Sequence, residues 1–208
     1  ARAHQRREAI LDATAQLMDR EGFSAVNTNA VAREAKTSIG ALYEYFPNKQ
    51  ALFIALLDRF RERLATAFST TLVNPPSAPD WRSIVDVLYG TFVDFYRTQP
   101  GYRELWLGSQ MTDVLTAEGQ RWGDDFTKLL DPLLAAIAPH LSVERRTIVL
   151  LSIVHLSSTL VTTGLQRGGD VEDALIREGR TILHRYLEPE FESEQTEAAH
   201  DRGGAETT

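Results

Sequence analysis

The chain has 208 residues, of which 43% are hydrophobic and 25% are charged, and its formal net charge is −7. That much apolar material supports one or two domains with a buried core and excludes a chain that is disordered throughout. The sequence contains no cysteine, which excludes disulfide bonds, thiolate metal sites and a catalytic thiol.

The first predicted element is a helix over residues 2–21 that ends at Gly22, a residue that favours helix C-termini. Its apolar residues recur three and four positions apart, and this spacing continues along the chain without convincing alternation of period two. We therefore expect an all-α fold.

Two unusually short helices follow. One begins after Asn27 and runs to about residue 36, and the other begins after Thr37 or Ser38 and ends before Pro47. Helices of ~8 residues are marginal in isolation, so neighbouring helices must pack them.

A longer amphipathic helix covers residues 49–71, and the proline-rich segment 73–79 after it is the best linker candidate. We therefore divide the first part of the chain into a DNA-binding head of residues 1–49 and a connecting helix of residues 50–72. A second domain of residues 80–188 follows.

The second domain reads as five further helices. They are predicted over residues 80–98, through residue 107, and over residues 111–137, 143–165 and 171–187, with Pro132 expected to split or kink the third. Residues 189–208 carry six acidic side chains and one arginine without an apolar period, which predicts a disordered tail.

The negative net charge argues against a nucleic-acid partner, because a polyanion repels an acidic chain. The acidity is local, however. Residues 1–49 carry seven basic and six acidic side chains, so the predicted head is close to neutral. DNA binding by this segment is therefore compatible with the composition.

The two short helices have the length and spacing of a helix-turn-helix, in which the second helix enters the major groove of DNA. Val31, Ala32 and Ala35 suit the packed side of the first helix, and Leu42 and Phe46 suit that of the second. Three residues with polar tips are expected outside, namely Tyr43, Tyr45 and Lys49.

Over about residues 6–57 the chain resembles the tetracycline-repressor (TetR) family. The resemblance rests on Arg7-Glu8-Ala9-Ile10-Leu11-Asp12-Ala13, Gly22-Phe23, Thr28, Val31-Ala32, the run from Ser38 to Lys49, and Leu52. Within it, Leu42-Tyr43-x-x-Phe46-x-x-Lys49-x-x-Leu52 is characteristic. The resemblance implies an all-helical homodimer with a DNA-binding head, a ligand-binding core and two last long helices that pair across the dimer.

The resemblance also implies roles for single residues. It places Thr28, Tyr43, Tyr45 and Lys49 near phosphates, and Asn29, Ser38, Ile39, Gly40, Ala41 and Glu44 near bases. Arg6, Arg7 and Lys36 would add charge for contacts with the DNA backbone. The family often has a glycine where Lys36 stands, and a lysine adopts a left-handed conformation only at some cost.

A small-molecule site is a further expectation for the second domain, because aromatic and small polar residues mix there as they do in ligand pockets. The candidates are Phe92, Tyr96, Tyr102, Trp106, Met111, Trp122, Phe126, Ser152, His155 and Thr159. The same aromatic residues fit a plain helical core, and His155 fits a hydrogen-bonded structural role, so both interpretations stay open. No histidine spacing indicates a metal, and no cofactor is predicted.

Dimerisation is predicted through the last two helices, whose candidate residues are Val149, Ile153, Leu156, Leu160, Leu175, Gly179, Ile182 and Tyr186. The sequence thus predicts a cytoplasmic repressor that binds a palindromic operator and is released by an apolar or aromatic effector, with no membrane partner. An alternative is a DNA-binding dimer whose second domain only dimerises. An enzyme is not predicted, because Ser152 and Ser157 near His155 lack a nucleophile elbow.

Overall fold

The computed structural model describes residues 2–73, 80–109 and 113–203, and every regular element in these ranges is a helix. In chain order they are α1 (Arg2–Glu21), the 3-10 helix η1 (Phe23–Ala25), α2 (Thr28–Glu34), α3 (Ile39–Tyr45), α4 (Lys49–Val73), α5 (Trp81–Thr98), α6 (Tyr102–Ser109), α7 (Asp113–Ile137), α8 (Val143–Arg167) and α9 (Gly169–Gly203). The predicted all-α class is confirmed. The three-residue η1 was not predicted, since so short a segment carries no periodicity.

The chain divides into two compact units. The N-terminal unit contains residues 1–70 and 91–122, and the C-terminal unit contains residues 71–90 and 123–208. The proline-rich linker marks a break in the chain, but the packing groups α6 and the end of α5 with the head. The reason is non-local, because these residues pack on α1 and α4 rather than on their own neighbours in sequence.

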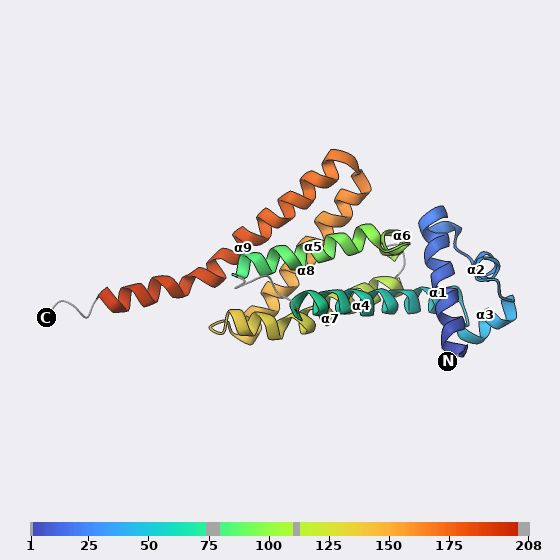
Figure 1. Ribbon diagram of the computed structural model, residues 1–208, viewed down its shortest axis with the longest axis horizontal. Helices are drawn as coiled ribbons and strands as arrows, with labels where there is room; N and C mark the ends of the chain where they lie inside the picture. Colours follow the sequence, from blue (N-terminus) through green and yellow to red (C-terminus); the bar gives the residue numbers. More distant parts are fainter. Residues whose placement is uncertain (1, 74–79, 110–112, 204–208) are drawn as a thin grey trace. The chain divides into compact units, whose positions relative to one another are not determined.

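The core of the N-terminal unit is built from one face of α1 and the apolar ridge of α4. Ile10, Leu11, Leu56 and Phe60 are fully buried within it. Phe60 also meets Tyr102 of α6 edge-to-face, with ring centroids 5.1 Å apart. In Figure 1, α2 and α3 lie beside α1 at the end of α4 where that helix begins.

The turn between α5 and α6 rests directly on α1. Gly101 has φ 72°, and a Cβ on it would lie 2.5 Å from the carbonyl oxygen of Ala15. Its amide donates a hydrogen bond to Oδ1 of Asp19 at 3.0 Å. Only glycine combines this left-handed backbone with so close an approach.

The C-terminal unit has a separate core, in which Leu130 and Leu134 of α7, Val149 and Leu150 of α8 and Leu187 of α9 pack together. The helices α8 and α9 form an antiparallel hairpin (Figure 1). Pro132 lies inside α7 without ending it.

Two features of α9 correct the prediction of a disordered tail from residue 189. The helix continues through Pro189 to Gly203, and Phe191 stacks on Trp81 with ring centroids 4.8 Å apart. Glu188 pairs with Arg82. The acidic composition hid this anchor, because a single aromatic ring with a distant partner leaves no periodic pattern.

Candidate nucleic-acid interface

Both short helices of the head are capped by side chains. Oδ1 of Asn27 accepts a hydrogen bond from the amide of Ala30 at 2.9 Å, and Oγ of Ser38 accepts one from the amide of Ala41 at 3.1 Å. These bonds satisfy amides that have no partner inside the helix. Two short helices can therefore begin at defined residues.

The predicted packing of the two helices is confirmed. Val31, Ala32, Leu42 and Phe46 are buried, whereas Ala35 is half-buried. The outward face of α3 follows from this arrangement, because the side that holds Leu42 faces the core.

The turn between the helices has the backbone that the family's glycine would supply. Lys36 has φ 51°, the one positive φ found at a non-glycine residue in the described part of the chain. The amide of Thr37 donates to the carbonyl oxygen of Ala32 at 2.9 Å, which closes the end of α2. The predicted left-handed lysine is thus present, and the turn keeps its geometry.

All thirteen residues proposed for DNA contact reach the surface. Ile39 is 38% exposed and Tyr43 47% exposed. Exposed as well are Arg6, Asn29, Lys36, Ser38, Gly40 and Glu44, and half-buried are Arg7, Thr28, Ala41, Tyr45 and Lys49. A hydrogen bond of 3.2 Å joins the hydroxyls of Thr28 and Tyr43, so the outer ends of α2 and α3 are linked.

Two of the basic candidates are already engaged inside the protein. Nη1 of Arg7 bonds Glu8 at 3.1 Å, and its guanidinium lies over the Phe46 ring. The ammonium of Lys49 lies over the rings of Phe23 and Phe53, and burial lowers its pKa. These contacts limit the directions in which the two cations can point.

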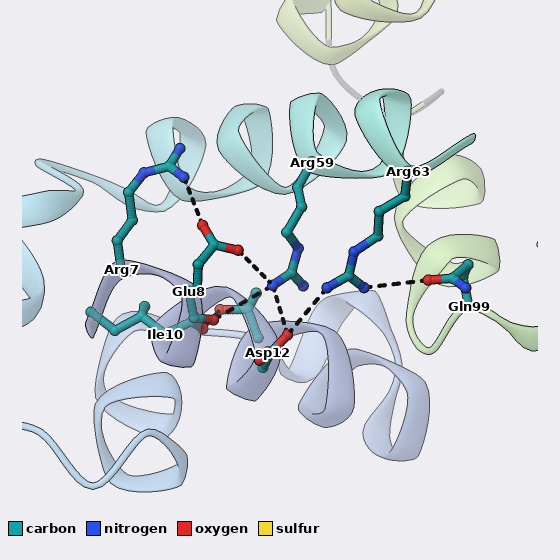
Figure 2. Close-up of polar contacts among 8 residues, drawn as sticks. Arg7, Glu8, Ile10, Asp12, Arg59, Arg63 and Gln99 are labelled. Carbon is teal, nitrogen blue, oxygen red and sulfur yellow. Dashed lines mark hydrogen bonds and ion pairs between the residues drawn. The ribbon is translucent and has the colours of Figure 1, made fainter. Parts of the chain in front are cut away.

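A buried arginine fixes α1 on α4, as Figure 2 shows. Nη1 of Arg59 is 2.7 Å from Asp12 and 3.6 Å from Glu8, and the Arg59 side chain is only 7% exposed. Arg63 is 3.8 Å from the same Asp12 and donates a hydrogen bond to Gln99 at 3.3 Å. The resulting network connects α1, α4 and the end of α5.

Burial is the first cause acting on Arg59, and together with Arg63 it lowers the pKa of the guanidinium despite the two carboxylates. An arginine nevertheless stays charged, because its ordinary pKa lies above 12. The sequence did not single out this group. An acidic residue at positions 8 and 12 of one helix was the available signal, since residues four apart share a face.

A second ion pair, also not predicted, joins α1 to α2. Arg20 makes two hydrogen bonds to the carboxylate of Glu34, at 3.2 and 3.0 Å. The pair raises the pKa of Arg20 and lowers that of Glu34, chiefly through this hydrogen bonding. It is solvent-exposed, so its contribution is mainly to orientation.

The predicted ligand residues do not form one cluster in the described structure. Phe92, Tyr96, Tyr102 and Trp106 pack ring against ring in the N-terminal unit, with Tyr96 and Tyr102 4.6 Å apart. Four others lie in the C-terminal unit: Phe126 is buried, Ser152 is half-buried, and His155 and Thr159 are exposed. Met111 lies outside the described residues, as does the side chain of Trp122, so a shared pocket stays a prediction.

His155 has the partner that an apolar helix requires. Its Nδ1 is 2.8 Å from the carbonyl oxygen of Leu151, one turn earlier in α8. Within the described ranges, no three His, Asp or Glu side chains converge as metal ligands would.

The predicted dimer residues fall into two groups. Val149 is completely buried in the core of its own subunit, and Gly179 packs against the hydroxyl of Tyr89. Neither can present a surface to a second chain, which corrects their assignment. Leu156 is exposed, and the remaining five, Ile153, Leu160, Leu175, Ile182 and Tyr186, are half-buried.

Comparison with known proteins gives matches over both halves of the chain. Residues 10–56 match the sequence profile described as "Bacterial regulatory proteins, tetR family", and residues 80–187 match that described as "Tetracyclin repressor-like, C-terminal domain". A TetR-family transcriptional regulator from Streptomyces coelicolor has a crystal structure that aligns with a TM-score of 0.71 at 31% identity. The alignment covers 88% of this chain and 97% of that one.

Two curated relatives match over shorter segments. The HTH-type transcriptional repressor KstR of Rhodococcus jostii is 45% identical over 60 residues, which are 29% of this chain and 28% of KstR. The HTH-type transcriptional regulator EthR of Mycolicibacterium smegmatis is 26% identical over 135 residues, which are 55% of this chain and 62% of EthR. The chain thus matches less than a third of the length of KstR.

Proposed function

Because the chain belongs to the tetracycline-repressor family of bacterial transcriptional regulators, we propose that it represses transcription as a dimer bound to a palindromic operator. A small, largely apolar or aromatic effector releases it from that DNA. The exposed outer face of α3 carries the proposal, because the residues that resemble the family's base contacts all lie at the surface of one capped helix. The protein acts in the cytoplasm, where its operator is.

Base recognition falls to the outer residues of α2 and α3. Asn29 can bond adenine at two atoms, and Glu44 can accept a hydrogen bond from cytosine N4. Ile39 and Ala41 can contact the methyl group of thymine, while Ser38 and Gly40 leave room for the helix to approach. Polar base contacts therefore come from two side chains, and apolar contacts supply the rest.

Phosphate contacts come from the rim of the same surface, where Thr28, Tyr43, Tyr45 and Lys49 lie, with charge from Arg6, Arg7 and Lys36. The head carries few excess positive charges, so a single head binds DNA weakly. Operator binding then depends on two heads joined in a dimer, with recognition helices about 34–36 Å apart or a multiple of that distance.

We assign the dimer surface to the exposed stripe of α8. Ile148, Ser152, His155, Leu156 and Thr159 follow one another at helical spacing and are exposed or half-buried in the single subunit. By length and hydropathy, α8 is also the one described helix able to cross a membrane, although little of its apolar window is buried within the chain. A partner subunit explains such a helix, since contiguous apolar surface needs cover.

The effector site is the least constrained element of the proposal. Tyr96 and Tyr102 are almost fully buried and fill space within the N-terminal unit. This packing favours a second candidate, a DNA-binding dimer whose C-terminal part only dimerises. A thermal-shift screen of apolar and aromatic compounds separates the two candidates, because ligand binding raises the unfolding temperature.

DNA binding is tested by selecting genomic fragments with the purified protein and footprinting those that it retains. The expected result is a protected palindrome whose half-sites lie one or more helical turns apart. Tyr43→Phe tests the phosphate contact, with an expected loss of about 1 kcal/mol for each head. Failure to retain any fragment above the level kept by Lys49→Met would contradict operator binding.

A further inference from the structure

The ammonium group of Lys49 is held between two aromatic rings. Its Nζ lies 5.5 Å from the ring centroid of Phe23 and 5.1 Å from that of Phe53. The two rings are themselves 4.9 Å apart and tilted by 40°. A cation is attracted to the faces of such rings, so they favour one position of this otherwise flexible side chain.

The two rings come from different parts of the head. Phe53 lies one turn after Lys49 on α4 and is buried. Phe23 lies in η1, between α1 and α2, and is half-buried. The position of the ammonium thus depends on a contact between segments that are about 26 residues apart in sequence.

Phe23 is in turn held by α6. A Cβ on Gly108 would overlap the Phe23 ring at Cγ, Cδ1 and Cδ2. Gly108 is buried in the last turn of α6, and its backbone is not in the left-handed region. The space taken by the ring is therefore the reason for glycine here, because any other residue would displace Phe23.

We propose that Phe23 is a positioning residue for Lys49, and that Gly108 of α6 determines where Phe23 lies. The inference rests on the proposed function, in which Lys49 contacts an operator phosphate. It adds that the strength of this contact is set by a residue of α6 that touches neither DNA nor Lys49.

The first test measures operator affinity of the full chain against NaCl concentration for Phe23→Leu, Lys49→Met and their combination. Lys49→Met should flatten the salt dependence by about two units of slope per dimer, since each phosphate contact contributes ~0.9. Phe23→Leu should weaken binding about two- to fivefold, the usual range for one exposed cation–π contact. In the Lys49→Met background it should add nothing.

Phe68→Leu is the matched control, because Phe68 is a buried phenylalanine of α4 far along the helix from Lys49. It should lower the unfolding temperature without changing the salt slope. If Phe23→Leu changed affinity equally with and without Lys49, its role would be structural and the proposal would be overturned.

The second test compares Gly108→Ala with Gly90→Ala, since Gly90 has no atom within 4 Å of its would-be Cβ. Gly108→Ala should reproduce the affinity loss of Phe23→Leu, and Gly90→Ala should leave binding unchanged. Equal affinity in Gly108→Ala and the wild type would remove α6 from the proposal.

A measurement without DNA separates this inference from the function on which it rests. The chain has three lysines, Lys36, Lys49 and Lys128, so NMR of ¹³C-labelled lysine reports on Lys49 with two internal references. Its side-chain resonances should show a ring-current shift that Phe23→Leu and Gly108→Ala both reduce. A shift that survives both changes overturns the positioning role, whereas unchanged binding in Lys49→Met removes the phosphate contact itself.

Discussion

The recognition helix α3 and the apolar helix α8 both expose isoleucine to solvent, but in different surroundings. On α3, Ile39 is flanked by exposed polar residues and glycine, and the seven-residue helix buries Leu42 alone. On α8, Ile148 is 53% exposed and begins a stripe that continues to Leu156 and beyond. Single exposed apolar side chains are ordinary, whereas a repeated one needs a partner.

The difference lies in what determines each surface. Capping side chains close in sequence define α3, so its outer face can be derived from the sequence. The outer face of α8 depends on which of its several apolar sides the α7 and α9 helices cover. The head is therefore a local structure, and the hairpin of α8 and α9 is a non-local one.

The largest expected effect tests whether the head is as local as its motif suggests. Asp12→Ala leaves the buried Arg59 without its nearest carboxylate and should cost about 3 kcal/mol of folding free energy. Urea unfolding followed by circular dichroism measures the loss. Arg20→Ala, which removes an exposed pair, should cost much less. Equal losses for the two variants would show that Arg59 is not a buried tie between α1 and α4.

The next effect concerns the exposed stripe of α8. Ile148→Asp places a charge in the proposed dimer surface once for each subunit, and should raise the dimer dissociation constant at least about 100-fold. Sedimentation equilibrium measures it. Leu129→Asp is the control, because Leu129 is also exposed but lies on α7. A dimer that tolerates Ile148→Asp would place the interface elsewhere.

A smaller effect is expected at the turn between α2 and α3. Lys36→Gly removes the cost of a left-handed lysine but adds the flexibility of glycine, for a net gain of about 0.5–1 kcal/mol. Lys36→Ala controls for the loss of charge while keeping the Cβ, and it should give no gain. Thermal unfolding distinguishes the two variants. A lower unfolding temperature in Lys36→Gly would mean that the lysine side chain itself stabilises the turn.

The smallest effect is a pH dependence in the C-terminal unit. Arg146 bonds the carboxylate of Asp131 at 2.8 Å, and this hydrogen bond lowers the pKa of Asp131. A carboxyl group whose pKa is lower in the folded state stabilises the protein above its unfolded pKa, and this stabilisation disappears as the pH falls through the folded value. The wild type should therefore exceed Asp131→Asn in unfolding temperature at pH 7, with the difference vanishing between about pH 5 and pH 2. A constant difference over that range would exclude the ion pair as its cause.

Most of the head could be derived from the sequence. Asn27 and Ser38 were identifiable as caps, Leu42 and Phe46 as packed residues, and Tyr43 as an outward one, since each property depends on neighbours within a few positions. The left-handed backbone of Lys36 followed from its place in the turn.

The C-terminal half was less accessible for a physical reason. In an apolar helix such as α8, hydrophobicity does not distinguish a side chain that meets its own core from one that meets another subunit. Val149 and Ile148 are adjacent and equally apolar, yet Val149 is buried and Ile148 is exposed. The anchor at Phe191 was hidden for the same reason, because its partner Trp81 is distant in sequence.

By itself, the sequence determined the helical class, the helix-turn-helix and the residues on its outer face, because caps, turns and periodicity act over a few residues. Only the tertiary structure decided that Arg59 meets Asp12, that Phe23 lies between Gly108 and Lys49, and that α6 packs with the head. These contacts join residues far apart in the chain, and their free energy exists only once the helices have packed.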